Sequence, residues 1–112
     1  MNGPNGGPVL AMFDLDGTLI EGYMEHPDKQ AAYGRVRPLP GRVERLAKLR
    51  ADGTRLAVIT NQAGVAFAHH DERAFERKWA KVSERFGFDD GFPVSLHVCY
   101  AHPRGREPYT LD

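Results

Sequence analysis

The sequence predicts an α/β fold in which a Rossmann-like parallel sheet carries flanking helices. Three short apolar runs, residues 9–13, 55–60 and 94–100, have the length and composition of strands. Stretches with helical periodicity separate them, and parallel strands require connections of this kind. A series of strand, helix, strand, helix and strand favours a single parallel sheet with right-handed crossovers.

The chain is expected to contain one domain, because 112 residues can bury one core but not two. Residues 1–8 are rich in Gly and Pro, and we expect them to form a flexible leader ahead of a domain over residues 9–112. The leader has no Lys or Arg and no long apolar run, so it is not typical of a signal peptide.

The first predicted strand is uniformly apolar, whereas the segment after it has no regular hydrophobic pattern. Residues 9–13 are apolar at every position, which suits a strand that is covered on both faces. From about residue 20 to residue 40 the periodicity is lost among Gly, Pro, His and charged residues. We interpret this segment as a long flap, since long loops in compact domains are often functional lids.

The next elements are a helix and a second strand. Val43 and Leu46 have helical spacing and Gly53 suits the end of a helix, so a helix is predicted over residues 41–52. Residues 55–60 then form a buried strand that is broken at residues 61–64.

A second helix is predicted between an N-cap at Asp71 and a terminator at Gly87. Its apolar residues recur at helical spacing and are expected in the core: Phe75, Trp79, Val82 and Phe86. The third strand follows at residues 94–100, and an irregular polar tail runs from residue 101 to 112.

Composition excludes several partners. Fifteen basic and fifteen acidic residues leave no net charge, so there is no global field to attract nucleic acid or an anionic membrane. No apolar run approaches the ~20 residues of a membrane span. A single Cys forms no internal disulfide and excludes a Cys₄ zinc module, which fits a reducing cytoplasm. The oligomeric state is not determined by these features.

Polar residues follow two of the predicted strands. Asp14 and Asp16 come at the end of the first strand, and Thr60 and Asn61 come at the end of the second. Ligands of parallel α/β sheets bind beyond the carboxyl ends of the strands. If the strands are neighbours, these four residues meet in one crevice.

The spacing of Asp14 and Asp16 suggests a metal. In extended geometry both carboxylates project to the same side, where they repel unless a cation such as Mg²⁺ lies between them. Gly17 then permits a sharp turn, and Thr18 offers a hydroxyl and an N–H. One carboxylate could attack phosphorus while the other moves protons, and Thr60 could hold the phosphoryl oxygens.

Residues 14–17 also have interpretations that involve no catalysis. Asp-x-Asp-Gly is also typical of a solvated turn or of part of a calcium loop. The interpretation as a calcium-binding loop is rejected because Thr18 and Ile20 break the pattern of ligands, although Glu25 lies at the position of the bidentate ligand.

Two motifs carry a family resemblance. Residues 13–19 (FDLDGTL) resemble the first motif of the haloacid dehalogenase superfamily of phosphohydrolases, and residues 58–65 (VITNQAGV) resemble its second. The Thr-Asn-Gln-x-Gly form is similar to the branch with histidinol-phosphate phosphatases, heptose-bisphosphate phosphatases and polynucleotide 3′-phosphatases. The resemblance implies a haloacid-dehalogenase-like fold with no large cap domain.

The resemblance also implies roles for individual residues. Asp14 would be the nucleophile and a Mg²⁺ ligand, and Asp16 the general acid/base that gives its carbonyl to the metal. Thr60 and Asn61 would bind phosphate together with the turn at Gly17 and Thr18. Because the second acidic position is Asp, phosphoester hydrolysis is favoured over dehalogenation.

The flap is where related sugar-phosphate enzymes make substrate contacts. Its Gly22-Tyr23 pair is similar to those members. The candidate specificity residues are therefore Tyr23, Glu25 and His26.

The C-terminal part departs from the family pattern. The third motif is a Lys or Arg and the fourth an acidic pair, yet in residues 106–108 (REP) Glu107 occupies the place of the cation. Residues 99–103 (CYAHP) resemble the start of a zinc loop, in which Cys99 and His102 could bind Zn²⁺, but Ala101 stands where a His is expected. Cys99 as a small buried hydrophobe is the competing interpretation.

Three strands in the usual 3-2-1 order leave the first strand as a sheet edge that needs a cover. This edge and the missing motifs indicate an incomplete core. Three further features have structural interpretations: His69 and His70 as a solvated pair, Phe75 and Trp79 as core, and the arginines at 35, 37, 42 and 45 as a mostly solvated surface. Arg35 or Arg37 could also reach a second phosphate.

The resulting prediction is a Mg²⁺-dependent phosphomonoester hydrolase that acts on a small phosphorylated metabolite through an aspartyl-phosphate, provided that the third and fourth motifs follow residue 112. One alternative is a catalytically inactive phosphate-binding or regulatory domain. The other is a nucleic-acid 3′-phosphatase, which the zero net charge disfavours.

Overall fold

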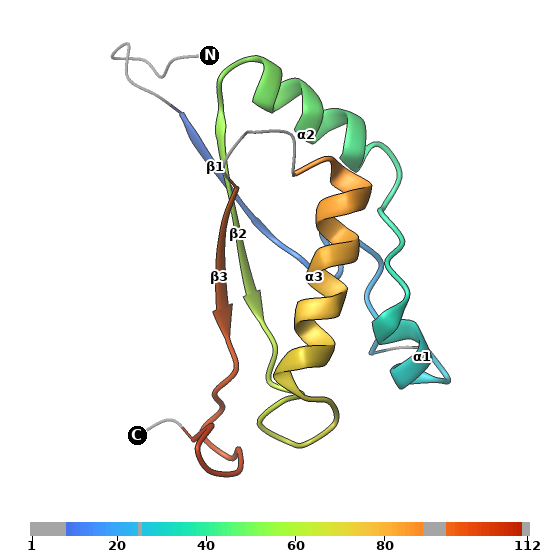
Figure 1. The fold of residues 1–112 in the computed structure, drawn as a ribbon, viewed down its shortest axis with the longest axis vertical. Helices are drawn as coiled ribbons and strands as arrows, with labels where there is room; N and C mark the ends of the chain where they lie inside the picture. The colour runs from blue at the N-terminus through green and yellow to red at the C-terminus, as the bar shows by residue number, and fades with distance from the viewer. Residues whose placement is uncertain (1–8, 25, 89–93, 111–112) are drawn as a thin grey trace.

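The computed structural model describes residues 9–24, 26–88 and 94–110, and its centre is a parallel sheet of three strands. β1 (Leu10–Asp14), β2 (Arg55–Asn61) and β3 (Val94–Cys99) lie in the order β1-β2-β3 (Figure 1). The register pairs Asp14 with Ile59 and Asn61 with Cys99. The carboxyl ends of all three strands therefore lie at the same end of the sheet, as the sequence predicts.

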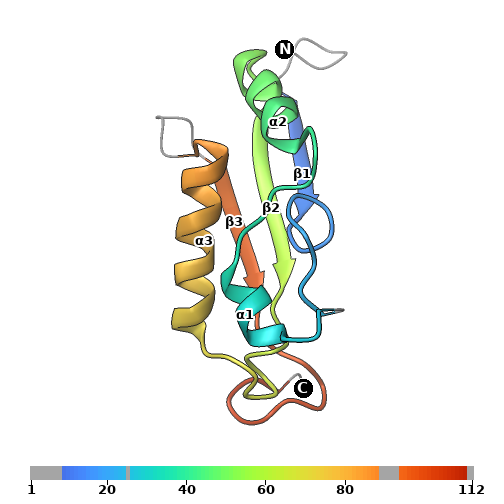
Figure 2. The same ribbon diagram turned by 90° about the vertical axis from the view of Figure 1, so that its right-hand side faces the viewer.

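The described helices all lie on one side of this sheet. They are α1 (Lys29–Gly34), α2 (Arg42–Ala51) and α3 (Glu72–Phe86). Figure 1 shows them to the right of the strands, and Figure 2, viewed from that side, shows them in front of the sheet with α3 next to β3. None of the described helices is long and apolar enough to cross a membrane.

Side chains on the covered face form the core. Leu56 and Val58 of β2 are buried there, and Phe75, Val82 and Phe86 of α3 belong to the same cluster. Trp79 is partly buried and packs against this cluster, so the predicted core face of the second long helix is confirmed.

The opposite face of the sheet is largely exposed. Leu10 and Met12 keep 56% and 58% of their surface, and Ile59 keeps 44%. The prediction that the first strand is covered on both faces is therefore wrong for the described residues. The expectation that β1 is a sheet edge is confirmed.

The long helices begin and end where the sequence predicts. Asp71 caps α3 by accepting a hydrogen bond from the N–H of Ala74, and Gly87 ends it in the left-handed conformation. α2 lies within the predicted range of residues 41–52.

The flap is more ordered than expected. It contains the six-residue helix α1, whose N-cap Asp28 accepts a hydrogen bond from the N–H of Ala31. Isolated bridges join Ile20 to Asp16 and to Pro38, which ties the base of the flap to the first motif. The expected flexible leader, residues 1–8, lies outside the described residues.

Candidate functional site

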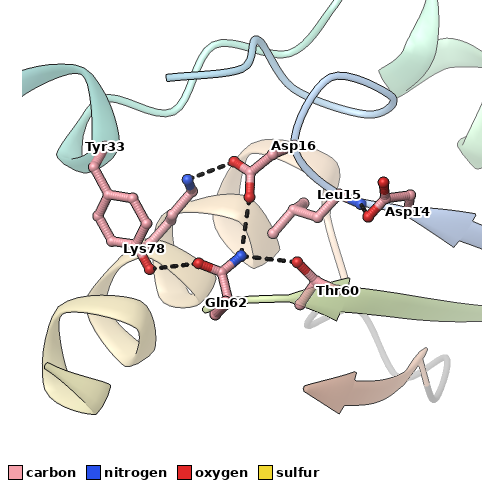
Figure 3. A network of polar contacts seen from close by, with 7 residues as sticks. All are labelled: Asp14, Leu15, Asp16, Tyr33, Thr60, Gln62 and Lys78. Carbon is pink, nitrogen blue, oxygen red and sulfur yellow. Dashed lines mark hydrogen bonds and ion pairs between the residues drawn. The ribbon is translucent and has the colours of Figure 1, made fainter. Parts of the chain in front are cut away.

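A buried polar network lies at the carboxyl ends of β1 and β2. The side-chain amide nitrogen Nε2 of Gln62 donates to Oδ2 of Asp16 at 2.9 Å and to Oγ1 of Thr60 at 2.8 Å. Its Oε1 accepts a hydrogen bond from the hydroxyl of Tyr33 at 2.8 Å. Figure 3 shows how this one side chain links the first motif, the second motif and α1. Because Gln62 is fully buried, the network fixes the position of Asp16 against β2.

Lys78 of α3 completes the network from the other side. Its Nζ lies 2.6 Å from Oδ1 of Asp16, and its side chain is 1% exposed. The same nitrogen lies 4.0 Å from the ring centre of Tyr33 and 4.7 Å from that of Tyr23. Burial lowers the pKa of Lys78, and the neighbouring negative charge of Asp16 opposes this shift. A buried cation and its carboxylate partner thus form the centre of the site.

The local sequence explains the direction of Asp16. β1 ends at Asp14, and the fully buried Leu15 anchors the chain in the core. Gly17 then adopts a φ of +82°, which favours glycine, and its N–H donates to the carbonyl of Ile20. This tight turn directs Asp16 toward α3 rather than along the strand.

Asp14 has different surroundings. It is exposed, and its Oδ1 accepts a hydrogen bond from the N–H of Leu15 at 2.8 Å. Figure 3 shows its carboxylate apart from the Asp16–Gln62–Thr60 network. The expectation that the two carboxylates project to one side is wrong, because the strand ends before Asp16 and extended geometry does not continue that far.

The other predicted phosphate-binding residues surround the same edge. Thr60 is 2% exposed and faces the network, whereas Asn61, the last residue of β2, is exposed. Gly17 is exposed, and the half-buried Thr18 accepts a hydrogen bond from Nε of Arg42 at its carbonyl. The strands thus bring the residues of both motifs to one edge, but only Asp16 and Thr60 share a hydrogen-bonding partner.

The donor atoms at this edge fit a hard divalent cation in part. In the described part of the chain, Oδ2 of Asp14 has no hydrogen-bonding partner, and carboxylate oxygens are the ligands that Mg²⁺ prefers. Among the described residues there is no group of three or more His, Cys, Asp or Glu side chains that could hold a metal. Asp14 is therefore the residue here best placed to contact a cation, while the Asp16 carboxylate is already paired.

A family model described as polynucleotide kinase 3 phosphatase matches residues 9–110. The chain belongs to this family. The histidine biosynthesis bifunctional protein HisB of Xylella fastidiosa strain M23 is 37% identical over 68 residues. That match covers 60% of this chain and 17% of HisB.

Solved structures share the fold. A HAD-like phosphatase from Mesorhizobium loti is 26% identical with a TM-score of 0.72, over 93% of this chain and 47% of that one. The D,D-heptose 1,7-bisphosphate phosphatase of B. bronchiseptica, complexed with magnesium and phosphate, is 21% identical with a TM-score of 0.71, over 90% and 57%. The haloacid-dehalogenase-like fold is confirmed, and the chain spans about half the length of these two proteins.

The three specificity residues predicted in the flap differ in burial and in their contacts. Tyr23 is half-buried, and its ring lies edge-on to Tyr33 with centroids 4.8 Å apart. His26 is exposed, and its Nδ1 accepts a hydrogen bond from the N–H of Asp28 at 3.0 Å. Glu25 lies outside the described residues. Of the three, Tyr23 is the one that the structure places beside Lys78.

The proposed zinc ligands make local contacts. Cys99 is exposed, so its interpretation as a buried hydrophobe is wrong, and its Sγ donates to the carbonyl of Ala101 at 3.8 Å. Nδ1 of His102 accepts a hydrogen bond from the N–H of Arg104 at 3.0 Å. The described residues provide no third ligand near them.

The adjacent histidines differ from each other. His69 is exposed, as a solvated residue should be, but His70 is half-buried and stacks on Tyr33 with ring centroids 3.8 Å apart. A Cβ on Gly64 would lie 2.3 Å from the His70 ring, so this packing requires glycine there. The solvated interpretation is therefore wrong for His70.

A cavity of about 740 Å³ opens beside the network, between α1 and α3. Its lining includes Tyr33 and Lys78, which belong to the network around Asp16, and Tyr23, whose ring contacts Lys78. No residue of either motif lines the cavity, and Lys78, which pairs with Asp16, connects its lining to the network.

Sequence reasoning missed the partners of Asp16. Lys78 lies three residues after Phe75 and four before Val82, within the buried stripe of α3. A lysine on the apolar face of an amphipathic helix is a signal for a buried ion pair. Gln62 was part of the second motif but had been given no role, although a fully buried glutamine must find hydrogen-bonding partners.

Proposed function

We propose that this chain carries the nucleophile and phosphate-binding residues of a Mg²⁺-dependent phosphomonoester hydrolase acting on a small phosphorylated metabolite. The carboxylate of Asp14 attacks phosphorus, and the bond between phosphorus and the ester oxygen breaks as the aspartyl-phosphate forms. Asp16 enters the reaction in its protonated form, donates that proton to the leaving oxygen and then recovers one from the water that releases phosphate.

One observation carries this proposal: the exposed carboxylate of Asp14 and the partly buried carboxylate of Asp16, held by two hydrogen bonds, lie at the edge where two motif-bearing strands end. Asp14 has an oxygen with no partner among the described residues, which suits a nucleophile. Asp16 is held by Gln62 and Lys78, which fixes it for proton transfer.

The remaining residues hold the phosphoryl group. Oγ1 of Thr60 accepts from Gln62, so its own hydrogen can be donated to a phosphoryl oxygen. The exposed Asn61 and the N–H groups around Gly17 and Thr18 supply further donors. Mg²⁺, when bound by Asp14 and the carbonyl of Asp16, would neutralise negative charge on the phosphate.

Several observations support a small phosphorylated substrate. The heptose phosphatase of the same fold was solved with magnesium and phosphate. The adjacent cavity of about 740 Å³ has the size of a small-molecule site. We propose a location in the cytoplasm, which fits the single exposed cysteine.

The test is release of phosphate from p-nitrophenyl phosphate with and without Mg²⁺. We expect Asp14→Asn to lower kcat by about 1,000-fold or more, because the nucleophile is lost. Asp52→Asn, at the C-terminal end of α2, is the matched control and should leave the rate unchanged. Turnover that does not require Mg²⁺, or that survives Asp14→Asn, would contradict the proposal.

A catalytically inactive phosphate-binding domain is the second candidate. It is favoured by the ion pair between Lys78 and Asp16 and by Glu107 at the place of the third-motif cation. Binding of Mg²⁺ and phosphate without any turnover would support it.

A nucleic-acid 3′-phosphatase is the third candidate, and the name of the matched family favours it. The balance of 15 basic and 15 acidic residues argues against it. Binding of a 3′-phosphorylated oligonucleotide that weakens steeply with added salt would support it.

A further inference from the structure

The cavity between α1 and α3 has a strong excess of positive charge. Its described lining includes four cationic side chains, listed here in chain order: Lys29, Arg77, Lys78 and Lys81. The acidic residue of the same lining is Asp71, whose carboxylate is already used to cap α3. The chain as a whole has no net charge, so this concentration of one sign is local.

Within the described ranges, two of the four cationic side chains have structural partners and two have none. Lys78 pairs with Asp16, and Lys81 donates to the carbonyl of Gly34 at 2.6 Å, which ties α3 to α1. The side chains of Lys29 and Arg77 are exposed, and neither makes a hydrogen bond or an ion pair with a described residue. Lys29 and Arg77 are therefore available to a ligand.

The position of the cavity connects these cations to the reacting group. Lys78 lines the cavity and contacts Asp16, and Tyr23 and Tyr33 line it beside the same ammonium group. Asp16 is the acid that the proposed mechanism assigns to the leaving group, and Lys78 belongs both to its ion pair and to the lining of the cavity. The exposed Met24 adds an apolar surface to the lining for a carbon chain.

We propose that this cavity is the leaving-group site and that Lys29 and Arg77 bind a second anionic group, a carboxylate or a phosphate, on the substrate. The inference rests on the proposed phosphatase function and narrows its substrates to phosphomonoesters with an acidic leaving group. The same charges repel a leaving group that carries an ammonium group.

A series of three small substrates of similar size tests the charge preference. 3-Phosphoglycerate carries a carboxylate, glycerol 1-phosphate is neutral at that end and phosphoethanolamine carries an ammonium group. We expect kcat/KM to be about tenfold higher for 3-phosphoglycerate than for glycerol 1-phosphate, which is the scale of one charge-assisted hydrogen bond. Phosphoethanolamine should be the poorest of the three.

Charge-removing variants test the assignment of residues. Lys29→Gln/Arg77→Gln should raise KM for 3-phosphoglycerate about tenfold or more and leave kcat and the hydrolysis of p-nitrophenyl phosphate unchanged. Arg73→Gln is the matched control, because Arg73 is exposed on the same helix and does not line the cavity. If Lys29 and Arg77 only stabilised the fold, the double variant would lower kcat/KM for all substrates equally.

The outcomes separate this inference from the proposed function. Equal kcat/KM for the three substrates, a preference for phosphoethanolamine, or an unchanged KM in the double variant would overturn the anionic-group site. If the wild-type protein hydrolyses neither these esters nor p-nitrophenyl phosphate, the phosphatase proposal fails instead. The cavity is then tested by calorimetric titration with 3-phosphoglycerate, and binding that the double variant does not weaken would overturn it.

Discussion

Gln62 is fully buried, and its side-chain amide connects residues that are far apart in the sequence. It donates to Asp16 and Thr60 and accepts from Tyr33. A buried polar group without a partner destabilises a fold more than its hydrogen bond stabilises it. The identity of this one residue therefore determines both the stability of the site and the position of Asp16.

We predict that Gln62→Leu lowers the free energy of unfolding by about 3 kcal/mol, because it leaves polar atoms of Asp16, Thr60 and Tyr33 without their partner. Urea unfolding followed by circular dichroism measures the loss. Gln30→Leu is the control, since Gln30 is exposed and its change should stay within about 0.5 kcal/mol. Equal losses in the two variants would contradict the assigned network.

His70 predicts a pH dependence. Burial, the positive charge of Lys78 and the neighbouring His69 lower the pKa of His70 below its usual value of 6.5. When the pH falls below about 6.5, the unfolded chain takes up a proton at His70 that the folded chain does not bind. The free energy of unfolding should therefore decrease on acidification until the folded ring also titrates.

His70→Phe removes this contribution while keeping a ring against Tyr33. We expect the difference in unfolding free energy between pH 7.5 and pH 5.5 to be smaller in this variant than in the wild type. His69→Phe, at an exposed position, should keep most of the wild-type difference, because burial and Lys78 lower the pKa of His70 more than His69 does. Identical pH profiles for the wild type and His70→Phe would show that His70 does not carry the effect.

At the scale of elements, the parts with strong local patterns were predicted and the parts defined by distant contacts were not. α2 and α3 are amphipathic, and the ends of α3 are marked by Asp71 and Gly87, so their ranges follow from the sequence. α1 has six residues and buries only Tyr33, which gives no periodic signal.

The candidate site divides in the same way. That Asp16 and Thr60 meet follows from their places at the ends of neighbouring parallel strands. That Lys78 joins them does not follow, because it lies 62 residues from Asp16 and depends on the rotation of α3 against the sheet. Pairings of this separation come from packing and not from local sequence.

The end of α3 provides a prediction at this scale. Gly87 has a φ of +71°, and the N–H of Phe88 donates to the carbonyl of Ser83 across it. Gly87→Ala should lower the free energy of unfolding by about 1 kcal/mol, because a Cβ disfavours this conformation.

The matched control for this variant is Gly34→Ala at the end of α1. Gly34 does not have a positive φ, and an added Cβ would meet nothing within 4 Å. Thermal unfolding should show that Gly34→Ala raises the free energy of unfolding by up to about 1 kcal/mol, since alanine restricts the unfolded chain. A loss at Gly34 as large as that at Gly87 would mean that backbone conformation is not the cause.

For the whole molecule, the main feature is a sheet with described helices on one face only. Leu56 and Val58 are buried against those helices, while Leu10, Met12 and Ile59 are exposed on the other face. β1 is also a sheet edge. An exposed apolar surface that continues to an unpaired edge favours association between chains.

We therefore predict that Met12→Lys/Ile59→Lys reduces self-association of the 112-residue chain, measured by sedimentation velocity at increasing concentration. The two lysines interrupt the exposed apolar face, and the one at position 12 also lies on the edge strand, where it opposes strand pairing. The unfolding free energy should change by less than about 1 kcal/mol, since both side chains already contact solvent. Val58→Ala is the comparison. Val58 lies on the buried face of the central strand β2, and its replacement should lower the free energy of unfolding by about 2 kcal/mol. If the double variant instead unfolds as readily as Val58→Ala, the face opposite the helices is covered in the folded protein and the one-sided sheet is not its state in solution.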